Sequence, residues 1–136
     1  MSSINRVLFL LIPILSLAAC AAKPGPQPTL EQKLAERNYR LGESVERILQ
    51  YRLDGWSYLD REHVIMQTEP STYYLISLRQ PCHGLMSAET IAFTTTTNQL
   101  TKFDKLLVKS SGSMIERCYI DALHKLKKTG KKLAAR

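Results

Sequence analysis

The side chains best suited to acid–base chemistry are Asp60 and His63, which lie three positions apart. A carboxylate beside an imidazole can orient a general base for proton transfer. The alternative is a surface turn with a solvated His63, which we expect because the segment 60–62 separates two strand-like segments. Asp104 has the same two interpretations, and a turn-forming role is again the expectation.

No established catalytic motif surrounds these side chains. The sequence has no G-x-S-x-G elbow, no H-E-x-x-H pair and no glycine-rich phosphate loop. We therefore expect a protein that is not an enzyme and that carries no cofactor.

Cysteine and histidine ligands for a metal are present but poorly spaced. The candidates are Cys82, His83, Cys118 and His124. Neighbouring side chains of an extended chain point in opposite directions, so Cys82 and His83 would not share one ion. Cys118 and His124 are six residues apart, which places them off one face of a helix. We expect no metal site.

Four aromatic residues fall in segments that read as strands: Trp56, Tyr58, Tyr73 and Tyr74. Such rings can form a platform on which a sugar stacks. In the strands of a small sheet they more often belong to the core. We expect core positions, with the platform as the alternative.

The beginning of the chain is typical of an export signal. After Arg6, an apolar segment runs from Val7 to Leu17, interrupted only by Pro13 and Ser16. As a helix it would rise about 17 Å, too little for the roughly 30 Å hydrocarbon core of a membrane. It fits the apolar region of a secretory signal peptide.

This segment ends in Leu17-Ala18-Ala19-Cys20, which resembles the lipobox of bacterial lipoproteins. The resemblance implies that residues 1–19 are a cleaved signal peptide and that Cys20 carries a lipid anchor in the membrane. Ala21 stands where inner-membrane lipoproteins usually have Asp, which implies the outer membrane, facing the periplasm. The alternative is an uncleaved hydrophobic anchor with an incidental Cys20.

The lipoprotein resemblance also determines how the other two cysteines are interpreted. With Cys20 assigned to lipid and the domain exported to an oxidising compartment, we expect one disulfide between Cys82 and Cys118. It would join the loop after the third strand to the start of the last helix. Two free thiols are the alternative.

The C-terminal end is basic, in a chain of 136 residues with a formal net charge of +7. No Asp or Glu follows Asp121, and six cations do: Lys125, Lys127, Lys128, Lys131, Lys132 and Arg136. They form either a solvated tail or a site for an anionic envelope partner, such as peptidoglycan, lipopolysaccharide or phospholipid head groups. Nucleic acid is not expected, because the signal peptide exports the chain.

The rest of the sequence divides into a tether, one domain and a tail. Residues 20–28 are rich in proline, which favours an extended tether. Residues 29–126 suffice for one hydrophobic core, and residues 127–136 are the basic tail. Thr29 and Gln32 form a potential capping box, which predicts a helix over residues 30–41.

Short segments rich in β-branched and aromatic residues predict an antiparallel meander. We expect its strands at residues 56–59, 63–68 and 72–78, with further strands at 91–96, 100–103 and 105–108. Ile120, Leu123 and Leu126 recur at helical spacing and predict a closing helix. The expected fold class is α+β, a small antiparallel sheet with a helix at each end.

Several landmarks resemble, in their spacing, a family of small proteobacterial lipoproteins of unknown function. They are Gly55-Trp56, Tyr73-Tyr74-Leu75, Pro81-Cys82 with Leu85, Phe103-Asp104, and Cys118 with Ile120. The resemblance spans about residues 40–126 and implies one domain with one disulfide, but no activity. We therefore expect a lipid-anchored envelope module with a structural or interaction role. The alternative is a small-ligand or sugar-binding domain that uses the aromatic side chains.

Overall fold

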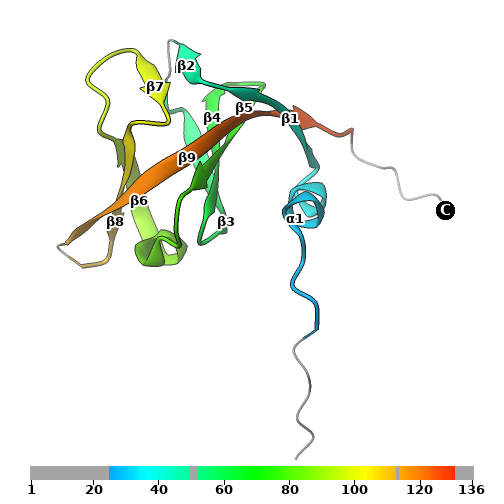
Figure 1. Ribbon diagram of the computed structural model, residues 1–136, viewed down its shortest axis with the longest axis horizontal. Helices are drawn as coiled ribbons and strands as arrows, with labels where there is room; N and C mark the ends of the chain where they lie inside the picture. Colours follow the sequence, from blue (N-terminus) through cyan, green and yellow to red (C-terminus); the bar gives the residue numbers. More distant parts are fainter. Residues whose placement is uncertain (1–24, 50–51, 113, 131–136) are drawn as a thin grey trace, which may run out of the picture.

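A computed structural model describes residues 25–49, 52–112 and 114–130, and in it the chain forms a curled antiparallel sheet with one α-helix beside it (Figure 1). The helices are α1 (Leu30–Glu36) and the 3-10 helix η1 (His83–Ser87). The strands are β1 (Tyr39–Val45), β2 (Arg47–Leu49), β3 (Gly55–Asp60), β4 (His63–Glu69), β5 (Thr72–Leu78), β6 (Ala88–Phe93), β7 (Gln99–Thr101), β8 (Lys105–Ser110) and β9 (Ile115–Lys128). Within these ranges, no helix is long and apolar enough to reach across a lipid bilayer.

The long strand β9 lies at the centre of the sheet. Its first half pairs with β8, while its second half pairs with β5 on one edge and with β1 on the other. The main sheet has the order β3-β4-β5-β9-β8-β6, with β1 also on β9, and β2 and β7 form a separate pair. Strand β9 therefore joins β3, β4 and β5 on one side of the main sheet to β8 and β6 on the other.

The predicted closing helix is wrong, because its residues form β9. Ile120 and Leu123 both face the inner core, and a register shift at Asp121 inserts one extra residue between them. Leu126 faces the opposite side of the strand and packs beneath α1. The bulge at Asp121 and the burial of Leu126 on the other face of the strand together give a spacing of three residues that is also typical of a helix. The α+β assignment is corrected accordingly: the described chain is mostly β.

The N-terminal helix is present but shorter than the expected 30–41. The capping box is confirmed, since the Gln32 amide donates to Thr29 Oγ1 and the Thr29 amide donates to Gln32 Oε1. The helix ends before Asn38, whose φ of 62° is left-handed, a conformation that Asn tolerates better than most residues. The chain then turns into β1, so Leu41 is a strand residue.

Both faces of the sheet are buried where α1 covers it. In β4 and β5 the side chains alternate between the inner core of the curled sheet and an outer cluster under α1. The inner core includes Val64, Met66, Ile76, Leu106, Cys118 and Leu123. The outer cluster consists of Leu34, Ile65, Leu75 and Leu126, with Leu30, Tyr39, Leu41, Leu59 and Tyr73 packed against it. The helix is therefore held by apolar contact with the back of the sheet.

Strands β3, β4 and β5 occupy the segments expected for the meander. Strand β9 extends to Lys128, two residues beyond the domain boundary expected at residue 126. Its last residues pair with the beginning of β1, a segment predicted from the sequence to be helical. The edge formed by β1 and β9 therefore carries part of the segment expected to be a tail.

Candidate functional site

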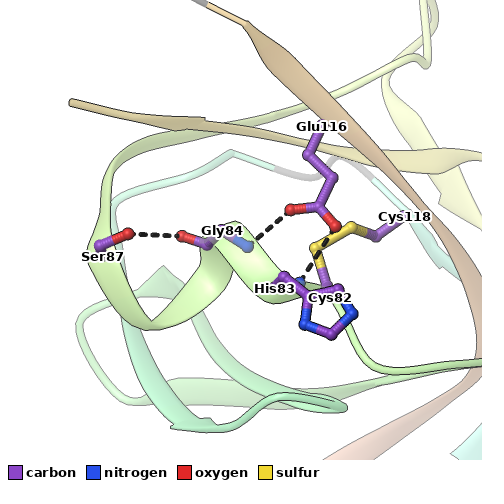
Figure 2. The surroundings of a disulfide bond; sticks show 6 residues. All are labelled: Cys82, His83, Gly84, Ser87, Glu116 and Cys118. Atoms are coloured by element: carbon purple, nitrogen blue, oxygen red, sulfur yellow. Dashed lines mark hydrogen bonds between the residues drawn. A yellow bond between two sulfur atoms is a disulfide. The ribbon is translucent and has the colours of Figure 1, made fainter. Parts of the chain in front are cut away.

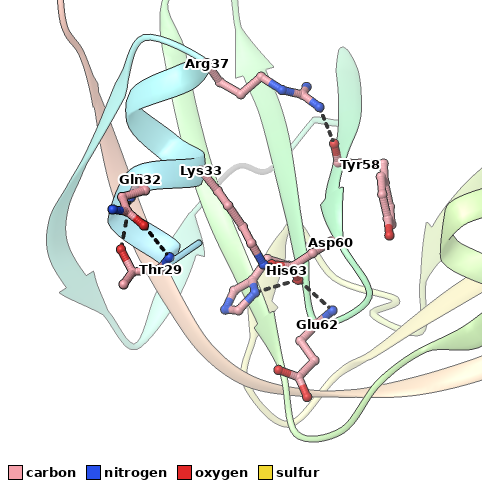
Figure 3. A network of polar contacts seen from close by, with 8 residues as sticks. All are labelled: Thr29, Gln32, Lys33, Arg37, Tyr58, Asp60, Glu62 and His63. Carbon is pink, nitrogen blue, oxygen red and sulfur yellow. Dashed lines mark hydrogen bonds and ion pairs between the residues drawn. The ribbon is translucent and has the colours of Figure 1, made fainter. Parts of the chain in front are cut away.

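Asp60, at the end of β3, accepts hydrogen bonds from three directions (Figure 3). Lys33 Nζ lies 2.6 Å from its Oδ2, while His63 Nδ1 and the Glu62 amide lie 2.7 and 2.9 Å from its Oδ1. The side chain of His63 is only 18% exposed. The solvated His63 expected from the sequence is therefore wrong, because α1 and Asp60 shield this turn.

The contacts of Asp60 decide its charge. Burial alone would raise the pKa of the carboxyl group, but hydrogen bonds from Lys33, the Glu62 amide and His63 together lower it below its usual value. A cleft of about 290 Å³ adjoins it, lined by Leu30, Lys33, Tyr58, Asp60, Arg61, Glu62, His63 and Pro81. This lining contains no Ser, Thr or Cys nucleophile. The group is arranged as a polar junction between helix and sheet.

The predicted disulfide between Cys82 and Cys118 is confirmed (Figure 2). The two Cα atoms are 5.9 Å apart, and both residues are buried in the inner core. The bridge joins the segment after β5 to β9, rather than to a helix. It therefore links the segments that come before β6 and after β8 in the sequence.

Glu116, close to the disulfide, caps η1 with both carboxylate oxygens. Its Oε1 accepts the His83 amide at 3.0 Å and its Oε2 accepts the Gly84 amide at 2.6 Å. Figure 2 shows the carboxylate between the 3-10 helix and the sulfur atoms. Since the sulfurs are bonded to each other and the carboxylate is bonded to two amides, this group has a structural role.

The other ligand considered for a metal, His124, is not brought to the cysteines. It lies six residues beyond Cys118 on β9, which corresponds to about 20 Å along a strand. Its partners across the ladders are Leu75 and Ser44. The structure thus joins Cys82 and Cys118 in a disulfide and keeps His124 apart from them.

Three of the six cations proposed for anionic-partner binding lie in β9: Lys125, Lys127 and Lys128. The remaining three, Lys131, Lys132 and Arg136, lie outside the described residues, as does Cys20. Because side chains of a strand alternate between its faces, Lys125 and Lys127 share one face and Lys128 points to the other. The structure does not unite the basic segment into one surface.

Arg40 is a cation that sequence reasoning missed. It lies directly opposite Lys127 in the β1–β9 ladder, so Arg40, Lys127 and Lys125 share one face. All three are exposed, and among the described residues none of them forms an ion pair. We call these three residues the β1–β9 cation patch. The pairing of Arg40 with Lys127 could not be anticipated from the sequence, because Arg40 lies in the segment 30–41 that was expected to be a helix.

Lys128, on the opposite face, contacts aromatic rings. Its Nζ lies 4.6 Å from the centroid of Tyr73, whose ring is 5.1 Å from that of Tyr39. Burial, together with the charge and hydrogen bond of Tyr73, raises the pKa of Tyr39 even though Lys128 opposes the shift. The hydrogen bond and charge of Tyr73 raise the pKa of Lys128. Lys128 thus contacts Tyr73 at the edge of the outer cluster and does not belong to the β1–β9 cation patch.

The aromatic residues considered for a sugar platform are divided between the two cores. Trp56, Tyr58 and Tyr74 are partly buried and pack against the inner core, and Tyr73 packs against the outer cluster. This arrangement agrees with the expected core positions. Tyr73 also lines a cleft of about 250 Å³ with Tyr39, Gly55, Trp56, Ser57, Ile65 and Gln67.

Comparison with known proteins identifies a family but no activity. No curated protein and no solved structure matches the chain. A family model described as a family of unknown function (DUF6491) matches residues 3–136. Because this match covers nearly the whole sequence, the protein belongs to that family of unknown function.

Proposed function

We propose that this protein is a lipid-anchored interaction module of the bacterial cell envelope. The lipobox-like segment Leu17–Cys20 supports an anchor at Cys20, and Ala21 supports the outer membrane, with the domain facing the periplasm. The partner is an anionic envelope polymer such as peptidoglycan, and it binds at the β1–β9 cation patch. The observation that carries this proposal is the cross-strand pair of Arg40 and Lys127, neither of which forms an ion pair with a described residue.

Electrostatics explains why this couple points to a ligand. Like charges directly opposite each other in a ladder destabilise the sheet. Glu43, in the β1 bulge, is the nearest acid in register, yet it forms no ion pair with the patch among the described residues. A bound carboxylate would relieve the repulsion, because it can face Arg40 and Lys127 together.

The surroundings of the patch favour a polar polymer. The large apolar side chains that are exposed in the described chain all lie outside β1 and outside residues 123–128. Each cation near an anionic surface contributes about 1 kcal/mol at best, so three would change affinity by about a hundredfold at low salt. Screening at physiological salt reduces this effect.

The test of the patch is retention on purified peptidoglycan sacculi. We expect the variant Arg40→Gln/Lys125→Gln/Lys127→Gln to lose most of its retention at low salt, while the wild type elutes as salt increases. The matched control is Lys105→Gln/Lys109→Gln/Arg117→Gln, which removes the same charge from another part of the sheet. Equal retention of patch variant and wild type, or equal loss in both variants, would refute a specific patch.

The anchor is tested separately by metabolic labelling with a tagged fatty acid. The wild type should be labelled and Cys20→Ser should not. A labelled Cys20→Ser protein, or a membrane-bound chain that retains Met1, would contradict lipidation at this position. Fatty-acid labelling does not involve the β1–β9 cation patch. The proposed lipid anchor and the proposed polymer partner are therefore tested independently of each other.

A second candidate function is small-ligand or sugar binding in the cleft beside Tyr39 and Tyr73. The observation in its favour is that Tyr39 and Tyr73 line this cleft together with Ser57 and Gln67, residue types that can bind a sugar by stacking and hydrogen bonding. Titration of muropeptide fragments, observed by protein NMR, distinguishes the two. Shifts confined to Gly55, Ser57 and Gln67 favour the cleft, and shifts at Arg40 and Lys127 favour the patch.

A further inference from the structure

The outer side of the β8–β9 ladder carries a second basic surface, with apolar side chains between the cations. The inward-facing rungs of this ladder contain Leu106 opposite Cys118 and Val108 opposite Glu116. The alternate rungs therefore face outward. They are Lys105 opposite Tyr119, Leu107 opposite Arg117, and Lys109 opposite Ile115. We call these six residues the β8–β9 face.

Both the charges and the apolar groups of this face are available to a partner. Ile115 and Tyr119 are 57% and 45% exposed. Lys105 Nζ lies 5.0 Å from the centroid of the Tyr119 ring, a contact that leaves its positive charge without an acidic partner. None of the three cations on the face forms an ion pair with a described residue.

One more apolar side chain is exposed at the end of this face. Met114, which directly precedes Ile115 and β9, is 85% exposed. Met86 in η1 is also 65% exposed, but η1 lies on the inner side of the ladder, because the inward-facing Glu116 binds the amides that begin it. Met114 and Ile115 are therefore the aliphatic side chains beside Lys109 on the face.

We propose that the β8–β9 face, with Met114 at its end, docks on the surface of an anionic phospholipid bilayer. Cations can bind the lipid phosphates while aliphatic tips enter the boundary with the acyl chains, and tyrosine is favoured at that boundary. A polysaccharide offers no environment in which exposed Met114 and Ile115 would be buried. The combination of aliphatic and cationic groups therefore distinguishes this face from the β1–β9 cation patch.

The position of the tether agrees with docking on the membrane that holds the anchor. In Figure 1 the blue segment 25–29 leaves α1 toward the lower side of the view, where the end of β8 and the beginning of β9 also lie. This part of the proposal rests on the proposed lipid anchor. Arg117, at the centre of the face, lies eight residues before Lys125 of the patch in β9, which corresponds to about 26 Å along a strand. The membrane and an anionic polymer could therefore be bound at the same time.

The test is hydroxyl-radical footprinting, with the labelled side chains identified by mass spectrometry. The protein is expressed from the full-length sequence, purified and reconstituted in vesicles. Phosphatidylcholine vesicles with phosphatidylglycerol are compared with vesicles of phosphatidylcholine alone. We expect labelling of Met114 and Ile115 to fall about tenfold in the anionic vesicles, if the docked state outweighs the free state by that ratio. Leu49, which is 63% exposed in β2, should remain labelled, and buried Met66 should remain unlabelled.

Matched variants separate docking from anchoring and from misfolding. The variant Lys105→Gln/Lys109→Gln/Arg117→Gln should lose the protection, whereas the β1–β9 patch variant should keep it. Low labelling of Met66 in each variant shows that the core is intact. If Cys20 carries no lipid, the same footprint is taken after mixing the protein with preformed vesicles, so that the two proposals fail separately. Equal labelling in both vesicle types, or protection by sacculi alone, would overturn membrane docking.

Discussion

Lys33 Nζ lies 2.6 Å from Asp60 Oδ2, and this ion pair holds α1 against the turn between β3 and β4. A helix of seven residues is too short to be stable by itself in water. The apolar contacts of Leu30 and Leu34 provide one attachment to the sheet, and Asp60 provides a second, directional one. The ion pair therefore helps to determine how the helix is oriented on the sheet.

Asp60→Asn should destabilise the protein at neutral pH, by about 1–2 kcal/mol, because hydrogen bonds to a charged group are lost. The pKa of Asp60 is lower in the folded chain than its usual 3.8, so the unfolded chain binds more protons at acidic pH. The stabilisation by Asp60 is thus present above that value and is lost as the pH falls through the folded pKa. Urea denaturation at several pH values should show the difference between wild type and Asp60→Asn closing in acid.

The control for this pH dependence is Asp121→Asn, which removes an exposed carboxylate from β9. Its free energy of unfolding should follow that of the wild type at every pH. A difference between wild type and Asp60→Asn that stays constant into strong acid would contradict the lowered pKa.

Loss of the disulfide should lower the free energy of unfolding by about 2–5 kcal/mol, the usual range for a native bridge in a small exported domain. Cys82→Ser, Cys118→Ser and the double variant should all show a similar loss, because each breaks the same bond. Urea denaturation measures the effect, and peptide mapping without reductant should recover the crosslinked pair. Recovery of both cysteines as free thiols from freshly isolated protein would disprove the bridge.

The cap on η1 should be sensitive to both of its components. In Gly84→Ala the new Cβ would lie 2.8 Å from Glu116 Oε2 and would push the carboxylate off the amides. Glu116→Gln keeps the size of the side chain but removes the charge that strengthens these bonds. Each variant should cost about 1–2 kcal/mol, and hydrogen exchange at the His83 and Gly84 amides should accelerate. Unchanged exchange in both variants would show that the cap contributes little.

Gly42 permits the close approach of β1 to β9. A Cβ at this position would collide with the backbone carbonyl of Lys125, which cannot move without disturbing the ladder. Gly42→Ala should therefore destabilise the protein by about 1–3 kcal/mol, as overpacked substitutions do. Gly112→Ala is the matched control, since its Cβ meets nothing within 4 Å. Equal melting temperatures for the two variants would contradict this close approach.

Truncation should separate the contribution of the end of β9 from that of the C-terminal residues beyond Gly130. Ending the chain after Leu126 removes two rungs with β1, the contact of Lys128 with Tyr73, and the bond from the Thr129 amide to the Asn38 carbonyl. A loss of 1 kcal/mol would lower the melting temperature by about 4–8 °C in a domain of this size. Ending it after Gly130 removes none of these contacts and should leave the melting temperature unchanged. Identical melting curves for the two truncations would contradict an ordered strand end.

The sequence by itself predicted the features that depend on neighbouring residues. The capping box needs only Thr29 and Gln32, and the three strands of the meander are marked by β-branched and aromatic residues with turns between them. The disulfide was predicted from the small number of cysteines and from the expected export of the chain. Each of these inferences concerns groups whose interactions are determined within a few residues or by the cellular compartment.

The tertiary structure decided β9, the helix end and both basic surfaces. Ile120, Leu123 and Leu126 are buried by β5, β1 and α1, partners far away in the sequence, and a bulge at Asp121 changes which face is inward. Arg40 became the neighbour of Lys127 only because β1 adds to the edge of β9. Periodicity reports how often a side chain is buried, but it does not report which element buries it or on which side. Only strand pairing over long sequence distances supplies that information.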